Sequence, residues 1–99
     1  MNVNDNAQRE MPRYKCHKEV WALKIDAIHF DSEVAKAENR ETDGSAWIYP
    51  EDKRYGPFQV DAAYARRHKP EAGGYYVRYK DGYESYSPAQ AFEEGYSPL

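Results

Sequence analysis

Apolar residues recur at every second position within residues 19–28, and the charged residues Lys24 and Asp26 lie on the opposite face. The apolar set is Trp21, Leu23, Ile25 and Ala27. A period of two predicts a β-strand with one buried face. A helix is the alternative, because alanine and leucine also suit helices, but the tryptophan and the β-branched residues favour the strand.

Residues 29–44 are polar and offer little to bury. A short helix over residues 32–40, capped by Asp31 or Ser32, is one interpretation of this stretch. A long connection without regular structure is the other, because an isolated short helix with so few apolar residues is marginal.

Two short extended segments and a helix are predicted next. Residues 45–49 form a strand that Pro50 stops, and residues 57–60 bring the chain back after a charged turn. Asp61 can then cap a helix over residues 62–68. The last turn of that helix holds cations, which suit the negative end of the helix dipole; they are Arg66, Arg67 and His68.

The last quarter of the chain predicts a β-hairpin. Asp81-Gly82 lies between two tyrosine-rich runs, which is the pattern of a two-residue type I′ turn. With Lys80 opposite Tyr83, one face carries Tyr75, Val77, Tyr79, Glu84 and Tyr86, and the other carries Tyr76, Arg78, Lys80, Tyr83 and Ser85. The first face is more apolar and should cover the core, so the second should point outwards.

A helix is predicted directly after the hairpin. Ser87 can cap it, Pro88 suits its first position, and Gln90 can complete a capping box. Gly95 stands where a left-handed stop belongs, and Phe92 should pack beneath the hairpin.

Together these elements predict an α+β fold. It has a small antiparallel sheet of three to five short strands, with a half-open barrel as the variant, and a C-terminal hairpin followed by a short helix. Residues 1–11 have almost nothing to bury and predict a flexible tail. Residues 12–99 are then one domain, since 99 residues hold a single modest core.

The composition predicts a folded chain whose core contains tyrosine rings as well as aliphatic side chains. Charged residues make up 31% of it, yet 15% is aromatic and ten residues are tyrosines. Disordered chains are poor in aromatic residues, so most of this chain should fold. Few aliphatic residues are available, so tyrosine rings should complete a thin core.

The net charge and the number of cysteines limit the partners and the cellular compartment that the sequence predicts. The net charge is −3, from 14 basic and 17 acidic residues, which argues against nucleic-acid binding. Cys16 is the only cysteine, so no internal disulfide can form and a reducing, intracellular compartment is expected. No apolar run approaches the roughly 18 residues of a membrane span.

Catalytic and metal-binding patterns are weak. Cys16 and His17 are adjacent, but His29 and His68 are distant in sequence and give no zinc-ligand spacing. Residues 72–74 precede a strand rather than open a helix, so they do not form a phosphate-binding loop. No enzyme activity, metal or cofactor is therefore expected.

The best candidate for a binding site is the outward face of the hairpin together with the preceding helix. Its residues are Tyr76, Arg78, Lys80, Tyr83, Arg66 and Arg67. Tyrosine and arginine are frequent at the centres of protein interfaces, so this face could dock an acidic surface. It could also hold a nucleotide by stacking and charge, or simply be solvated.

Two stretches of the chain resemble a widespread group of short proteins from tailed phages and prophages. They are MPRYKCHKEVWALKI and PFQVDAAYARRHKPEAGGYYVRYKDGYESYSPAQAFEEGY, and the resemblance covers most of the chain. The resemblance implies a phage origin and carries no catalytic residues.

A phage origin favours a protein that acts by binding. The leading hypothesis is a non-enzymatic accessory protein that inhibits a host component, such as an anti-phage defence protein or complex. One alternative is a sponge for a cyclic or ADP-ribose-like signalling nucleotide, and another is a virion or assembly component. No membrane partner is expected, and the sequence leaves homo-oligomerisation open.

Overall fold

The structure is a computed structural model, and it describes residues 19–96. The predicted tail over residues 1–11, together with Cys16 and His17, lies outside the described residues. In chain order the elements are β1 (Val20–Phe30), α2 (Asp31–Ala37), β2 (Ala46–Pro50), β3 (Phe58–Val60), α3 (Ala62–His68), β4 (Tyr75–Tyr79), β5 (Glu84–Ser87) and α4 (Ala89–Gly95).

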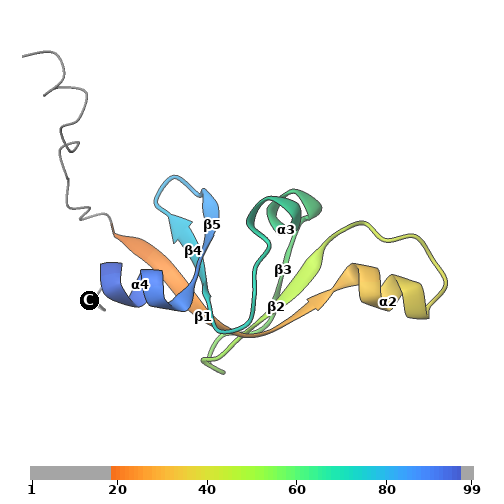
Figure 1. The fold of residues 1–99 in the computed structure, drawn as a ribbon, viewed down its shortest axis with the longest axis horizontal. Coiled ribbons are helices and arrows are strands. Elements are labelled where there is room, and N and C mark those ends of the chain that lie inside the picture. The colour runs from red at the N-terminus through yellow and green to blue at the C-terminus, as the bar shows by residue number, and fades with distance from the viewer. Residues whose placement is uncertain (1–18, 97–99) are drawn as a thin grey trace, which may run out of the picture.

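Five antiparallel strands form one curved sheet in the order β3-β2-β1-β4-β5. The long strand β1 lies in the middle and bends (Figure 1). Its second half pairs with β2, which pairs in turn with β3, and its first half pairs with β4, which pairs in turn with β5. Helix α3 lies on the inner side of this bend. The predicted α+β fold, with an open half-barrel and a C-terminal helix, is confirmed.

A β-bulge in the middle of β1 sets which residues are buried. The pairing register shifts between Ile25 and Ala27, so Ile25 and Ile28 both pack on the core side. An extra residue in one strand reverses the alternation beyond it. The prediction that Ala27 continues the buried face is therefore wrong, and Trp21, at the start of the strand, is largely exposed.

The core lies on the inner side of the sheet, beneath α3. Its buried members are Ile25, Ala46, Ile48, Val60 and Tyr64, and the residues packed around them are Ile28, Phe30, Phe58, Tyr76 and Tyr86. Tyrosine rings do complete a thin aliphatic core. Among them the Tyr64 hydroxyl donates a hydrogen bond of 2.6 Å to the carbonyl oxygen of Ser85, which joins α3 to the edge strand β5.

The hairpin has a three-residue loop rather than the predicted two-residue turn. The Tyr79 N–H donates to the carbonyl of Tyr83, and the Gly82 N–H donates to the carbonyl of Tyr79. Gly82 alone has a positive φ, of 90°, which is the form of a type I turn with a glycine bulge. The pairing register differs from the predicted one by one residue. Tyr76 therefore pairs with Tyr86 and lies on the same face of the hairpin, whereas the prediction placed these two tyrosines on different faces.

The two faces of the hairpin therefore differ from the prediction. Tyr76 and Tyr86 both pack against the core. Tyr75 lies on the other face, where its ring stacks on Phe92 of α4 with centroids 4.1 Å apart. The expected packing of Phe92 on the hairpin is confirmed, but it occurs on the side of the sheet away from the main core.

The predicted caps of α4 do not form. The N-cap position is Pro88, which has no side-chain cap, and the Ser87 hydroxyl donates to the Pro88 carbonyl instead. The Gln90 amide bonds to Glu94. Gly95 is the last helical residue, and its φ is not positive.

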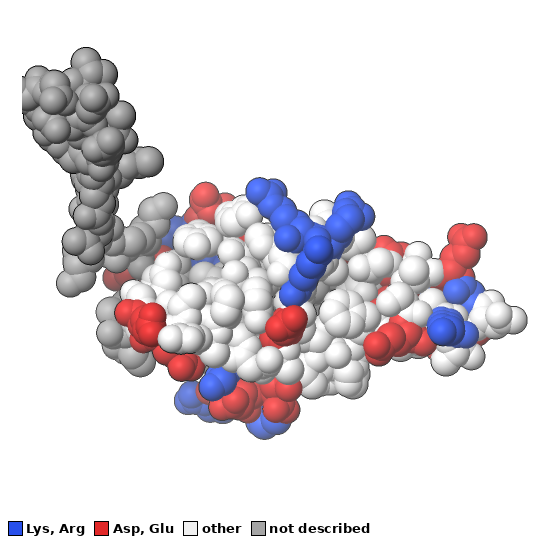
Figure 2. Space-filling view, viewed as in Figure 1, with Lys and Arg blue, Asp and Glu red and all other residues white. Residues whose placement is uncertain are grey.

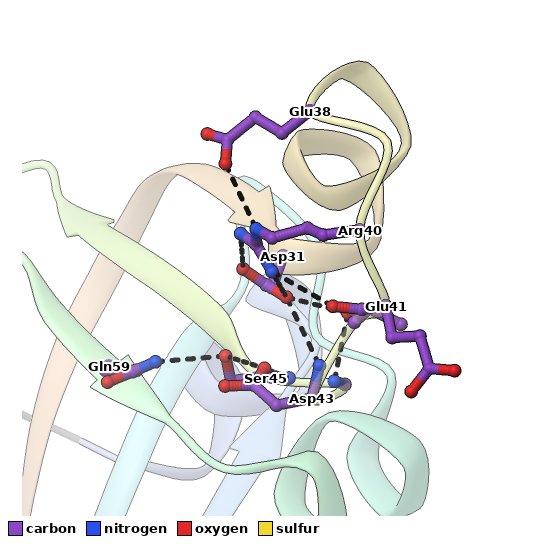
Figure 3. Close-up of polar contacts among 9 residues, drawn as sticks. Asp31, Glu38, Arg40, Glu41, Asp43, Ser45 and Gln59 are labelled. Carbon is purple, nitrogen blue, oxygen red and sulfur yellow. Dashed lines mark hydrogen bonds and ion pairs between the residues drawn. The ribbon is translucent and has the colours of Figure 1, made fainter.

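A short helix does follow β1, and Asp31 anchors the loop after it (Figure 3). Asp31 does not cap the helix. Its carboxylate accepts hydrogen bonds from Arg40 Nη2 at 2.8 Å, Thr42 Oγ1 at 2.8 Å and the Asp43 N–H at 3.3 Å. Asp43 in turn accepts from the Ser45 N–H at 2.9 Å. These bonds organise residues 38–45 without an apolar core of their own.

The Asp31 contacts predict acid sensitivity. Hydrogen bonds from Arg40 and then Thr42 hold the pKa of Asp31 well below its ordinary value of 3.8. A carboxylate whose pKa is depressed on folding stabilises the protein above its unfolded pKa, and that stability is lost as the pH falls. We expect the unfolding midpoint in urea to decrease below about pH 4, and Asp31→Asn to flatten this decrease. Glu33→Gln, an exposed change in the same helix, should leave the pH profile unchanged; an equal flattening by Glu33→Gln would contradict the assignment.

Candidate functional site

The predicted binding residues begin with the end of α3. Asp61 caps this helix as predicted, since its carboxylate accepts from the Tyr64 N–H at 2.8 Å. Arg66 and Arg67 occupy the last turn, and Lys69 follows in a left-handed conformation with φ of 44°. We call Arg66, Arg67 and Lys69 the α3 cationic cluster.

Aromatic rings connect this cluster to the tip of the hairpin. The rings of Tyr64 and His68 lie 4.8 Å apart, and those of His68 and Tyr83 lie 6.0 Å apart. The Arg67 guanidinium lies 5.7 Å from the centre of the Tyr83 ring, within cation–π range. The structure thus brings together Arg67 and Tyr83, two residues of the candidate site that are far apart in sequence.

Tyr76 lies beneath this surface rather than on it. Its ring contacts Phe58, with centroids 4.7 Å apart, and Tyr64, at 5.9 Å. Its hydroxyl donates to the Glu84 carboxylate. Burial, and then this bond to Glu84, raise the pKa of Tyr76 above its usual range. Tyr76 was predicted to lie on the outward face because the prediction assumed the wrong hairpin register.

Arg78 and Lys80 have other neighbours. The Arg78 guanidinium lies 5.7 Å from the Trp21 ring, its partner across the β1–β4 pair. Lys80 Nζ lies 3.5 Å from a carboxylate oxygen of Glu19. The six predicted residues are therefore divided: Arg67 and Tyr83 meet directly, Arg66 adjoins them on α3, and the others lie along β4 and at its end.

Among the described residues, the α3 cationic cluster has no acidic partner. Within residues 19–96, five of the lysines and arginines make ion pairs: Lys24, Arg40, Lys53, Arg54 and Lys80. The others are Lys36, Arg66, Arg67, Lys69 and Arg78, and three of these five form the cluster. Figure 2 shows a group of Lys and Arg side chains rising over α3, surrounded mainly by uncharged surface.

This arrangement is suited to binding by charge and ring contact. Within residues 19–96 no group of three histidine, cysteine or acidic side chains is placed to hold a metal ion. In the same part of the chain, no helix is both long and apolar enough to cross a membrane.

Two residues that lie at or near the candidate binding residues were not among those predicted from the sequence. Trp21 reaches Arg78 only because β1 pairs with β4, a long-range contact that no local pattern indicates. Lys69 follows the predicted helix directly, and its place beside Arg66 could have been inferred from the helix end alone. His68 was predicted as a last-turn cation, but its position between Tyr64 and Tyr83 depends on α3 docking against β5.

Comparison with known proteins gives a structural relative. No protein-family model and no curated protein sequence matches the chain. The fold is similar to the NMR solution structure of the monomeric form of the phage L decoration protein, with a TM-score of 0.58 and 28% sequence identity. The match supports a phage protein. It covers 97% of this chain and 63% of that one, so this chain spans less than two thirds of the length of the decoration protein.

Proposed function

We propose that this chain is a virion component that attaches to the surface of a phage capsid as a decoration protein. The observation that carries the proposal is the structural match to the phage L decoration protein, which extends over nearly the whole of this chain at 28% identity. A role in binding also fits the exposed surface on which the Arg67 guanidinium lies over the Tyr83 ring.

The same observation changes the order of the three hypotheses drawn from the sequence. The match favours the virion component, and nothing in the comparisons supports an inhibitor of host defence or a nucleotide sponge. The proposed partner is therefore a capsid protein rather than a host complex, and the role is structural rather than enzymatic. The site of action is the virion, with the host cytoplasm as the place of synthesis.

The test is the composition of the virion. We expect gradient-purified particles of the phage that encodes this chain to contain it at a constant ratio to the major capsid protein across preparations, as measured by quantitative mass spectrometry. A phage carrying a deletion of the gene provides the control. Absence of the chain from purified particles, with abundant chain in the infected-cell lysate, would contradict the proposal.

A further inference from the structure

We infer that the α3 cationic cluster and Tyr83 dock against an acidic protein surface. The inference rests on the proposed function and names that surface as a carboxylate-bearing region of the capsid protein. Its physical basis is charge complementarity. Arg66, Arg67 and Lys69 are exposed and have no carboxylate partner in the described part of the chain, and the Arg67 guanidinium lies over the Tyr83 ring.

The absence of acidic partners at the cluster is informative because this chain pairs many of its other cations. Arg54 Nη2 lies 2.7 Å from Asp52, and Arg40 Nη2 lies 2.8 Å from Asp31. The chain has 17 acidic residues for 14 basic ones, so acids are not scarce. Arg66, Arg67 and Lys69 nevertheless have no carboxylate partner among residues 19–96. Neighbouring cations repel one another, and an acidic partner would relieve that repulsion.

The helix dipole accounts for only part of the cluster. Cations are favoured in the last turn of a helix by about 0.3–1 kcal/mol each. Helix α2 meets this preference with Lys36 alone, whereas α3, which has the same length of seven residues, ends with Arg66, Arg67 and His68 and is followed by Lys69. The additional charge on α3 therefore needs a different explanation.

Tyr83 gives the surface an ordered aromatic centre. It is 43% exposed, yet its backbone is held on both sides, because its N–H donates to Asp81 Oδ1 at 2.9 Å and its carbonyl accepts from the Tyr79 N–H. Its ring lies under the Arg67 guanidinium. Ordered tyrosine and arginine side chains are the residues that most often dominate binding energy at protein interfaces.

A protein surface fits this cluster better than a nucleic acid. Nucleic-acid binding requires a basic track that follows successive phosphates, but acidic residues interrupt the charge here at short distances in sequence. They are Asp61 before α3, Glu71 after Lys69, and Asp81 and Glu84 on either side of Tyr83. We therefore expect the partner to be a short acidic loop rather than an extended polyanion.

The experiment compares matched charge reversals in a capsid co-sedimentation assay. The variants are Arg66→Glu and Arg67→Glu, and the control is Lys36→Glu, which reverses another unpaired cation in the last turn of a seven-residue helix. The probe is capsids from a phage lacking the gene. We expect each arginine variant to bind about tenfold more weakly than wild type, and Lys36→Glu to bind as wild type. All three variants should show similar, small decreases in melting temperature, because each puts a negative charge at the end of a helix.

The outcomes separate the inference from the function on which it rests. If wild-type protein does not sediment with capsids, both are overturned. If wild type binds and the arginine variants bind equally well, the inference is wrong and the proposed function stands. Wild-type binding should also weaken between about 50 mM and 500 mM NaCl, because salt screens exposed charges; salt-independent binding would overturn the inference even if a variant failed to fold. A labelled DNA duplex bound as tightly as capsids, and lost with the same arginines, would replace the acidic protein surface by a nucleic acid.

Discussion

Ile48→Ala is expected to remove a large part of the stability of this domain. Ile48 is fully buried, at 0% exposure, in the middle of β2, where it pairs with Ile28 on one side and Phe58 on the other. Truncating a buried isoleucine to alanine costs about 2–5 kcal/mol, because apolar contact is lost and a cavity remains. Small domains are stable by only about 5–15 kcal/mol, and this core has few other large aliphatic side chains.

The neighbouring residue provides the control for this variant. Trp47 precedes Ile48 in the same strand but points to the opposite face of the sheet, where it is 43% exposed. Trp47→Ala removes a larger side chain, yet it should cost at most about 1 kcal/mol, as most changes at exposed positions do. Urea unfolding followed by circular dichroism measures both. Equal destabilisation by the two variants would show that the core does not lie on the assigned face.

Gly74→Ala is expected to destabilise the domain by a different mechanism, the crowding of a tyrosine ring. A β-carbon at Gly74 would lie 2.5 Å from Cε1 and Cζ of Tyr86, far inside van der Waals contact. Tyr86 packs against the core, so the ring cannot move away without loss. Overpacking of this kind costs about 1–3 kcal/mol.

A second glycine and a second variant test that explanation. A β-carbon at Gly56 would have no atom within 4 Å, so Gly56→Ala should change the stability by less than about 1 kcal/mol in either direction. In a Tyr86→Leu background, Gly74→Ala should cost less than in wild type, because the crowded ring is gone. A cost that is unchanged in that background would point to backbone conformation instead of crowding.

Local patterns were enough to predict most elements of the fold. The alternation in β1, the Asp61 cap of α3 and the glycine at the hairpin turn each depend on neighbouring residues, and each element formed where expected. The errors came from features that local patterns do not determine. A three-residue loop moved the register of the hairpin by one, and a bulge in β1 changed the buried set after Ile25.

In the candidate site, too, local patterns predicted some residues correctly, whereas features that depend on long-range pairing were missed. Arg66 and Arg67 could be placed from the helix that carries them, and the structure adds the contact between Arg67 and Tyr83. Tyr76 could not be placed, because its orientation depends on the hairpin register, and it belongs to the core. The partner of the site could not be predicted from residues at all, since binding surfaces on similar folds serve unrelated functions.

Attachment to the capsid is the central claim, and a saturation titration tests it most directly. Capsids purified from the phage that lacks the gene are mixed with increasing amounts of the wild-type chain, and the bound chain is quantified after sedimentation. Binding to a repeated site predicts a plateau at a fixed number of copies per major capsid protein, reached at the same ratio with each capsid preparation. No binding, or binding that rises without a plateau, would contradict a decoration protein.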